Sequence, residues 1–170
     1  MPSKVYNNVE DHRLIDGNSV VEDVTKVGLP TIKHDTTTIS AAGMAMDVDM
    51  PNATHLSSME YSITHNNGVN CKLLGTPGRH EQEFRTVRQR YNVAAGAIEH
   101  ESVKYRLVGV HVSTEKGDIE TGSPYGSTEK YSCLRYEEEI NGEVVTIIDA
   151  AGVIKYNGKT YTDEVQNMLK

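Results

Sequence analysis

Three tight-turn dipeptides constrain the fold more than any other feature of this sequence. Asp16-Gly17, Asn141-Gly142 and Asn157-Gly158 tolerate the positive φ angles that two-residue β-hairpin turns require. Each lies between two strand-like segments, which predicts antiparallel pairing along much of the chain. The expected pairs are Val5–Ile15 with Val20–Val27, Tyr131–Ile140 with Val144–Ile148, and Val153–Tyr156 with Thr160–Tyr161. The turns therefore predict a mainly β fold.

Two segments alternate in polarity, as strands with one solvent-exposed face do. In Leu56–His65, the residues Met59, Tyr61 and Ile63 fall on one face and polar residues fall on the other. In Tyr131–Ile140 a charged face and an apolar face also separate. The expected charged face holds Arg135, Glu137 and Glu139, and the expected apolar face holds Leu134, Tyr136 and Ile140.

One strand candidate is polar on both faces. Glu81–Val93 contains strand-forming residues, but its charged side chains fall on both sides; they include Glu83, Arg85, Arg88 and Arg90. Such a strand cannot lie inside a sandwich core, because charged groups are costly to bury without partners. We expect it at a solvated edge, or facing a water-filled space and a subunit boundary.

Two further strands have distinctive patterns. The apolar positions of Ser102–Ser113 shift by one residue near Leu107-Val108, which predicts a bulge or a switch of face. Val144–Ile148 is nearly continuously apolar, which predicts a central strand that is buried.

Residues 29–50 are expected to form an extended arm. Its threonines favour extended backbone because branching at Cβ restricts χ1, whereas Met44, Met46 and Met50 have no evident core partner. Exposed apolar patches are rare in monomers, so we expect the arm to pack on a neighbouring molecule. The alternative is that the methionines lie under the subunit's own sheet.

The composition indicates a domain with a thin core. A chain of 170 residues has the length of one domain, but it contains no Trp, one Phe and nine Tyr. We therefore expect association with other copies to complete the burial, with a plain monomer as the alternative. The net charge of −7 argues against a generic phosphate-binding surface, so no sequence-specific nucleic-acid binding is expected.

Targeting and cysteine patterns point to a soluble product of the cytoplasm. The N-terminal residues do not resemble a signal peptide, and no apolar run approaches the roughly 20 residues of a membrane helix, so we expect no membrane partner. Cys71 and Cys133 lack a C-x-x-C spacing and are interpreted as structural thiols, with a pairing between them left open.

No recognisable catalytic, cofactor-binding or metal-binding motif is present in the sequence. His80-Glu81-Gln82-Glu83 lacks the second histidine of the H-E-x-x-H motif, and the seven histidines are interpreted as surface or interface residues. Glu137 and Glu139 are candidates for acid–base chemistry, but without a partner they are better explained as a stripe facing solvent or a water-filled lumen. We therefore expect no enzyme activity, cofactor or metal.

Two helices and one loop complete the expected organisation of a single domain, 1–170. Val69–Leu74 is expected to form a short helix with Asn67 as a possible N-cap. Residues 162–169 are expected to form a helix whose apolar stripe docks on a sheet. That stripe consists of Val165, Met168 and Leu169. Residues 115–130 are expected to form a long loop with a role in some interaction.

The order of several segments resembles the major tail tube proteins of contractile-tailed bacteriophages and related phage-tail-like particles. The matching segments, in chain order, are Lys4–Val9, Val24–Ile32 (VTKVGLPTI), Ala42–Met44, Asp47–Met50, Leu56–Ile63, Asn141–Glu143, Ile147–Asp149 and Ile154–Gly158. They span most of the chain, and their order carries the resemblance more than any single motif does. One departure is the segment 68–74, which is shorter than the family's helix at this place.

The resemblance implies a β-sandwich or barrel-like tail tube subunit with a short internal helix and a C-terminal helix. It further implies hexameric rings that share a continuous inner β-barrel and stack into a hollow tube inside a contractile sheath. The implied partners are other copies of the chain, the tail sheath protein, the tape measure protein, and then DNA or an effector in the lumen, whose acidic wall would repel phosphates. The implied location is the virion tail or a tail-like particle, with synthesis in the cytoplasm of the host bacterium.

Under this interpretation the arm at 29–50 joins one ring to the next. The expected contact residues between rings are Thr37, Ile39, Met44, Met46 and Met50, and those between subunits or along the lumen are Glu83, Arg85, Arg88 and Arg90. The arginines are expected to pair with a neighbour's carboxylates rather than to line the channel. Two alternatives are a monomeric β-sandwich that binds carbohydrate or peptide through residues 115–130, and a hydrolase that uses Glu137 or Glu139.

Overall fold

The computed structural model describes residues 4–66 and 71–170 and shows a mainly β chain with two short helices. The strands are β1 (Lys4–Asp16), β2 (Ser19–Val21), β3 (Val24–Gly28), β4 (His34–Ile39), β5 (Val48–Leu56), β6 (Glu60–His65), β7 (Arg79–Asn92), β8 (Ala97–Lys116), β9 (Ser127–Ile140), β10 (Glu143–Asp149), β11 (Val153–Tyr156) and β12 (Lys159–Thr160). The helices are α1 (Cys71–Leu74) and α2 (Thr162–Met168). The predicted fold class, with an internal and a C-terminal helix, is confirmed; the expected N-cap Asn67 lies outside the described residues.

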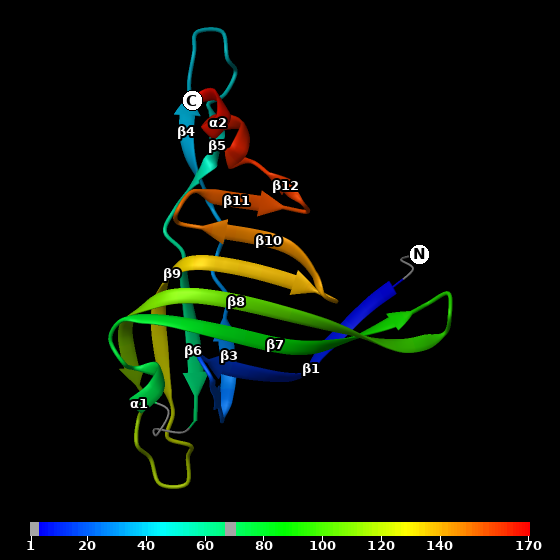
Figure 1. The fold of residues 1–170 in the computed structure, drawn as a ribbon, viewed down its shortest axis with the longest axis vertical. Helices are drawn as coiled ribbons and strands as arrows, with labels where there is room; N and C mark the ends of the chain where they lie inside the picture. The colour runs from blue at the N-terminus through cyan, green and yellow to red at the C-terminus, as the bar shows by residue number, and fades with distance from the viewer. Residues whose placement is uncertain (1–3, 67–70) are drawn as a thin grey trace.

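Ten strands form one sheet in which β9 is the branch point (Figure 1). The sheet runs β12-β11-β10-β9-β8-β7-β1-β2, while β6 pairs with residues 127–132 of β9 and carries β3 on its other side. Residues 135–140 of β9 pair instead with β10. The sheet curls back so that Nε2 of His12 in β1 lies 2.7 Å from the carbonyl oxygen of Val24 in β3. One half of the sheet is therefore barrel-like, and β10–β12 extend it beyond the barrel.

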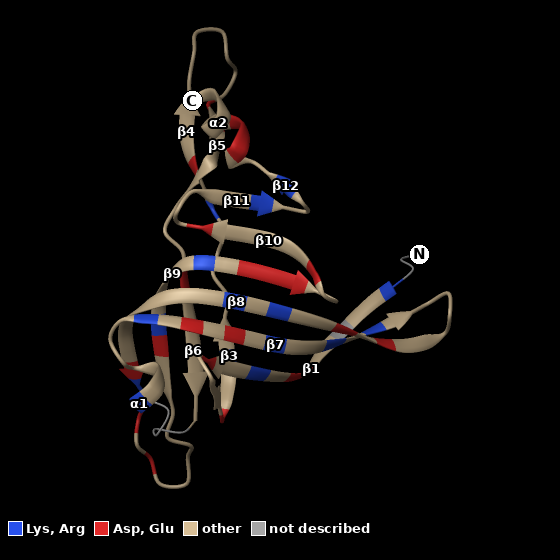
Figure 2. Cartoon of the chain, in the orientation of Figure 1, with Lys and Arg blue, Asp and Glu red and all other residues tan. Residues whose placement is uncertain are grey.

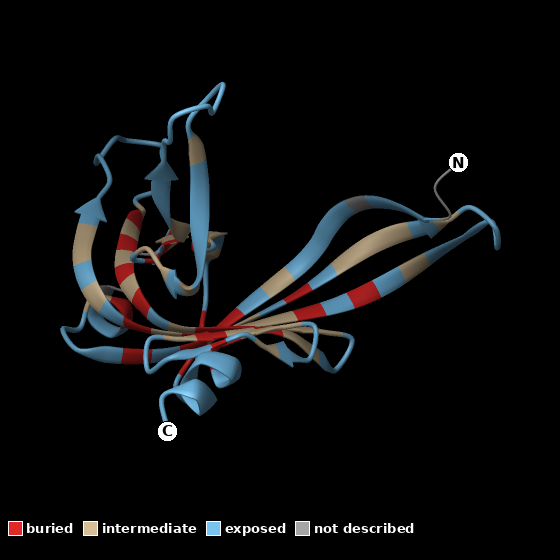
Figure 3. Cartoon of the chain, turned by 90° about the horizontal axis from the view of Figure 1, so that it is seen from above, coloured by how far each residue is buried: buried red, intermediate tan, exposed pale blue. Residues whose placement is uncertain are grey.

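Strands β4 and β5 form a separate two-stranded sheet that projects from the rest of the molecule (Figures 1 and 3). At its base, Ser57 donates a backbone hydrogen bond to Lys33 and a side-chain hydrogen bond of 2.5 Å to Oδ1 of Asp35. The second strand continues to Leu56, past the expected end of the arm at residue 50. The predicted strand Leu56–His65 is consequently divided between the end of β5 and β6.

The three predicted hairpin turns are confirmed. Gly17, Asn141 and Asn157 have φ angles of 58°, 50° and 47°, and each lies in the turn between two antiparallel strands. Asp23 also has a positive φ of 59°. This residue lies between β2 and β3, which explains why the predicted segment Val20–Val27 forms two short strands instead of one.

The core lies inside the curled half of the sheet and is built around stacked tyrosines. The rings of Tyr61 and Tyr131 are 4.9 Å apart, and Leu74 of α1 is buried in the same cluster. Tyr61 packs so closely on the backbone of Gly109 that a Cβ there would come within 2.7 Å of the ring. Each fully buried large apolar side chain contributes about 1.5–3 kcal/mol to folding. The predicted inward face of Met59, Tyr61 and Ile63 is confirmed.

A bulge lies where the sequence pattern of β8 shifts, but β8 does not change face. Val108 pairs with Arg135 and Gly109 pairs with Cys133, which leaves Leu134 of β9 as the extra residue. The bulge lies near Leu107-Val108 as predicted, but its extra residue belongs to β9 and not to the predicted strand Ser102–Ser113. The placement of Leu134 on the face of Tyr136 is wrong, because the bulge leaves Leu134 exposed while Tyr136 is buried.

The connection between β8 and β9 is shorter than expected. The predicted loop 115–130 is wrong at both ends, because β8 continues to Lys116 and β9 begins at Ser127. The ladder persists beyond the last apolar residues since its polar side chains pair across the strands, as Lys130 does with Glu115. The backbone N–H of Gly117 donates to the carbonyl oxygen of Gly126 at 2.9 Å and closes the loop.

Two expectations about the C-terminal part are wrong. Strand β10 is not buried throughout, because only Thr146 and Ile148 are buried and their neighbours are partly exposed. Helix α2 does not dock through its apolar stripe: Met168 is 78% exposed, and Thr162 is the buried residue of the helix.

Candidate functional site

The projecting β4–β5 hairpin is the first candidate surface. Within the described residues its strands form a ladder only with each other, and most of their residues are exposed. All five predicted contact residues are exposed, and Met46 is the most exposed of them at 74%. They are Thr37, Ile39, Met44, Met46 and Met50. The alternative in which the methionines lie under the subunit's own sheet is therefore wrong.

The second candidate surface is one face of β7, β8, β9 and β10, which we call the charged face. Its ion-paired residues are Arg79, Glu81, Glu83, Arg85, Lys104, Arg106, Arg135, Glu137, Glu139 and Asp149. The register places Arg106 directly between Glu83 of β7 and Glu137 of β9. Figure 2 shows the resulting basic and acidic bands side by side on neighbouring strands.

Arg106 is the centre of the charged face. Its guanidinium lies 3.5 Å from Glu83 and 3.2 Å from Glu139, and it donates a hydrogen bond to Glu137. The remaining ion pairs are Arg135 with Glu137 and with Asp149 (both 3.1 Å), Lys104 with Glu139 (3.1 Å), Arg79 with Glu81 (2.8 Å), and Arg85 with Glu83. Each of these five acidic and five basic groups thus has a partner on the same face.

Ion pairs shift the pKa of residues of the charged face, including Glu83 and Arg135. Partial burial acts to raise the pKa of Glu83, but the hydrogen bond from Arg85 and the charges of Arg85, Lys104 and Arg106 outweigh it and hold the pKa below its usual value. The hydrogen bond to Glu137 raises the pKa of Arg135, with a further contribution from Asp149. These groups stay ionised at neutral pH and attract one another.

A second ion-pair cluster lies on the opposite face of β7 and β8. Arg88 is 2.8 Å from Glu101, and Arg90 is 2.9 Å from Glu99 and 3.3 Å from Glu101. The four predicted residues are therefore divided: Glu83 and Arg85 belong to the charged face, and Arg88 and Arg90 to this cluster. Strand β7 is polar on both faces as predicted, but it lies between β1 and β8 and is not an edge strand. Its arginines already have carboxylate partners within the chain.

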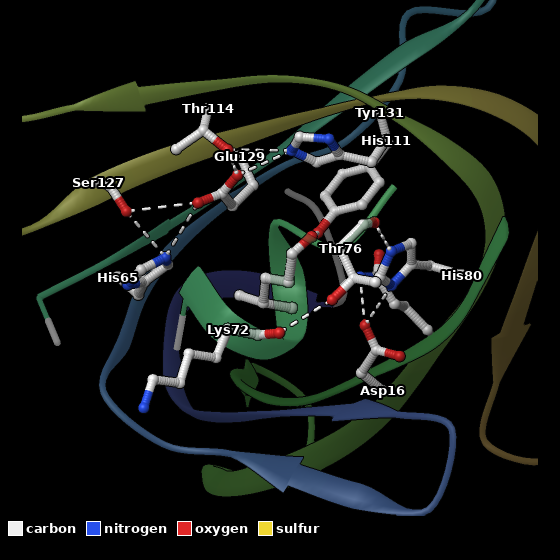
Figure 4. Close-up of polar contacts among 12 residues, drawn as sticks. Asp16, His65, Lys72, Thr76, His80, His111, Thr114, Ser127, Glu129 and Tyr131 are labelled. Carbon is white, nitrogen blue, oxygen red and sulfur yellow. Dashed lines mark hydrogen bonds and ion pairs between the residues drawn. The ribbon is translucent and has the colours of Figure 1, made fainter. Parts of the chain in front are cut away.

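Two buried polar networks were not predicted from the sequence (Figure 4). Glu129 is fully buried; it accepts hydrogen bonds from Thr114 and lies 2.9 Å from Nε2 of His111 and 3.6 Å from Nε2 of His65. The other network joins Nδ1 of His80 to Asp16 at 2.9 Å. The interpretation of the histidines as surface or interface residues is therefore wrong for His65 and His80.

One signal in the sequence indicates the inward position of Glu129. Tyr131 and Cys133 are large or apolar and alternate with polar residues, and Glu129 continues the same alternation two residues earlier. The burial of Glu129 is possible because two histidines and two hydroxyl groups surround it.

Neither the charged face nor the described histidines form a metal site or an evident catalytic centre. A groove of about 630 Å³ beside the β1–β2 turn is lined by Glu83, Arg85, Arg106, Arg135 and Glu137. The lowered pKa of Glu83 favours its ionised form over that of a proton donor, and the carboxylate of Glu137 is ion-paired with Arg106 and Arg135. Among the described residues, no group of three or more His, Cys, Asp or Glu is placed to hold a metal ion. No described helix has the length and apolar character to cross a membrane.

A third surface is the distal part of β1. Strand β2 pairs with β1 only from Leu14 to Asp16, so the preceding residues of β1 have a partner on one side alone within the described residues. Val5, Tyr6 and Val9 are exposed along this open edge. An edge that is long and apolar is a site for pairing with another strand.

The fold and these surfaces define a β subunit built for assembly: a curled sheet with an open edge, a charged face and a projecting apolar hairpin. The family model of phage tail tube protein FII matches residues 12–169, and the chain belongs to this family. It is a structural subunit of a tail tube. No curated protein sequence matches the chain.

Two solved structures with chains that resemble this one are of an extracellular contractile injection system. The chain is similar to one in the sheath/tube terminator of an extracellular contractile injection system, PVC, in the extended state, with a TM-score of 0.53 and 12% identity over 78% of this chain and 96% of that chain. A chain of the PVC sheath-tube complex in the extended state gives a TM-score of 0.49 and 12% identity, over 75% of this chain and 87% of that chain. At this identity the first likeness establishes the fold.

Proposed function

We propose that this chain forms hexameric rings that stack into a hollow tube, a conduit for DNA in a phage tail or for an effector in a tail-like particle. The observation that carries the proposal is the projecting hairpin, whose apolar residues are exposed in the subunit and suit a contact with the next ring. Membership of the tail tube family supports it independently.

Within a ring, the open edge of β1 suits pairing with the sheet of the neighbouring subunit. Closing the sheets into a continuous inner barrel would remove the unpaired edges, which is the general advantage of barrels. Residues Glu83 and Arg85 of the charged face would then line the lumen, because this face presents ionic side chains to water. Arg88 and Arg90 would lie toward the boundary between subunits.

The other proposed partners are a contractile sheath outside the tube, and a tape measure protein and then DNA or an effector inside it. A chain similar to this one belongs to a sheath/tube terminator, which supports a sheath partner. The role is mechanical, so we infer no enzyme activity, no cofactor and no metal. The protein would be made in the cytoplasm of the host bacterium and be incorporated into the virion tail or tail-like particle.

Negative-stain electron microscopy across a concentration series tests the assembly. Rings or hollow tubes are the expected result, and a monomer that persists at high concentration under all conditions would contradict the proposal. The same experiment separates it from a monomeric binding module, which would remain a monomer.

The hairpin has its own test within the same assay. Deletion of residues 36–46 removes most of β4 and the tip with Met44 and Met46, but no residue of the ten-stranded sheet. Rings without tubes are expected, and normal tubes from the deletion variant would refute the contact between rings.

A further inference from the structure

The charged face is balanced in charge although the chain as a whole is strongly acidic. Its ion pairs join five basic and five acidic groups, whereas the chain carries a net charge of −7. The acidic excess therefore lies on other parts of the molecule. The part of a lumen wall formed by these four strands would be neutral overall, with Arg13 of β1 opposite Arg85 as a further positive charge, unlike the acidic wall that the family resemblance implied.

The basic residues of the charged face are well arranged to bind phosphate. Arg85, Arg106 and Arg135 come from three strands that are neighbours in the sheet, and adjacent strands are about 4.8 Å apart. Guanidinium groups match the geometry of phosphate oxygens and bind them with two hydrogen bonds. Unpaired, such a row of cations would bind DNA through the release of counterions.

Carboxylates already contact each of these guanidinium groups, as Glu83 contacts Arg85. Arg106 contacts three of them, in Glu83, Glu137 and Glu139, while Arg135 contacts Glu137 and Asp149. Partly exposed ion pairs contribute only about 0–1 kcal/mol to folding stability, so stability alone does not account for a network of this size.

We propose that the acidic residues of the charged face act as internal competitors for phosphate and prevent DNA from binding to the arginines. This inference rests on the proposed function, since that function brings DNA past this face. Glu83, Glu137 and Glu139 have the central part because they surround Arg106. The wall then does not bind DNA because carboxylates are already paired with its cations. An excess of negative charge is not required to keep DNA from binding.

Two variants with equal net charge test the inference. Glu83→Gln, Glu137→Gln and Glu139→Gln together free three cations, Arg85, Lys104 and Arg106, and leave Arg135 with Asp149. They change the net charge from −7 to −4. The matched control combines Asp118→Asn, Glu120→Gln and Glu164→Gln, which are exposed residues of the β8–β9 loop and α2, and has the same net charge of −4. Binding of a fluorescent 30-base-pair duplex is measured by anisotropy at about 50 mM salt, where phosphate contacts are strongest.

The charged-face variant is expected to bind the duplex, with an affinity that falls with salt at a log–log slope of about −3 for three freed cations. Wild type and control are expected not to bind. DNA binding by wild type, equal binding by the control, or no binding by a folded charged-face variant would each overturn the inference.

If circular dichroism shows that the triple variant is unfolded, Glu83→Gln with Glu139→Gln is tested instead, because Glu137 is the most buried of the three. This double variant is also expected to bind the duplex, with a smaller slope. The assay does not require tubes, so a failure of assembly would be detected separately by microscopy.

Discussion

Replacement of the buried Glu129 by glutamine is expected to destabilise the subunit strongly. Glutamine has nearly the same size as glutamate, so the core keeps its packing and no cavity forms. The change removes the negative charge beside His111 and His65, and it weakens the hydrogen bond from Thr114. The measured loss therefore reports the polar interactions of this network.

The magnitude follows from the burial of the network. Glu129 is fully buried and His65 is fully buried too, so solvent does not screen their interaction. A hydrogen bond to a buried charged group contributes about 1.5–3 kcal/mol, and Glu129 has more than one such contact, with His111, Thr114 and Ser127. Since glutamine retains some hydrogen bonding, we expect a loss of about 2–4 kcal/mol. In a domain of this size that lowers the Tm by roughly 5–15 °C.

Chemical and thermal denaturation of dilute, unassembled protein measure this loss, because assembly would add stability of its own. Glu143→Gln is a matched control at an exposed position of the β9–β10 hairpin, and its effect is expected to stay within about 0.5 kcal/mol. A Glu129→Gln variant as stable as this control would refute the reasoning, and it would mean that the carboxylate contributes no net stabilisation.

Two other predictions concern the hairpin and the free thiol. Met44→Gln combined with Met46→Gln should leave the Tm of the subunit unchanged within about 2 °C, because both side chains are exposed, but should shorten or abolish tubes in electron microscopy; tubes of normal length would contradict a role in stacking. Burial raises the pKa of the Cys133 thiol to about 11, so in a Cys71→Ser background its reaction with a thiol reagent at pH 8 should be about a hundredfold slower than that of free cysteine. Fast labelling of the folded protein would show that Cys133 is accessible as a thiolate.

Local chemistry explains which parts of the fold the sequence could predict. The turns at Asp16-Gly17, Asn141-Gly142 and Asn157-Gly158 depend on residues that tolerate positive φ, and neighbouring residues alone decide this. The inward face of Met59, Tyr61 and Ile63 depends on a period of two, which is likewise local. Features of this kind can be predicted from a short segment, because residues elsewhere in the chain do not decide them.

The errors arise where distant residues decide the outcome. The apolar stripe of α2 suggests a surface that docks on a sheet, but the pattern cannot specify whether the partner lies in the same subunit, and Met168 is exposed in this one. The bulge at Leu134 depends on the register between β8 and β9. The partners of Glu129 include His65, which is 64 residues away in the sequence, so composition near residue 129 gives no sign of them.

The candidate surfaces also include features that neighbouring residues decide and features that distant residues decide. The exposure of Met44, Met46 and Met50 could be inferred from their lack of apolar neighbours in sequence. The pairing of the arginines with carboxylates could not be inferred from the sequence, because Arg106 meets Glu83 and Glu137 only through the register of three strands. The sequence therefore predicted arginines that await a neighbour's carboxylates, whereas the structure pairs them within the chain.

A cryo-EM reconstruction of the assembled protein tests the central claim most directly. The account predicts a hollow tube of stacked rings in which the β4–β5 hairpin crosses to the adjoining ring and Glu83, Arg106 and Glu137 face the lumen. A tube with these three residues on its outer surface, or with the hairpin folded back on its own subunit, would contradict it.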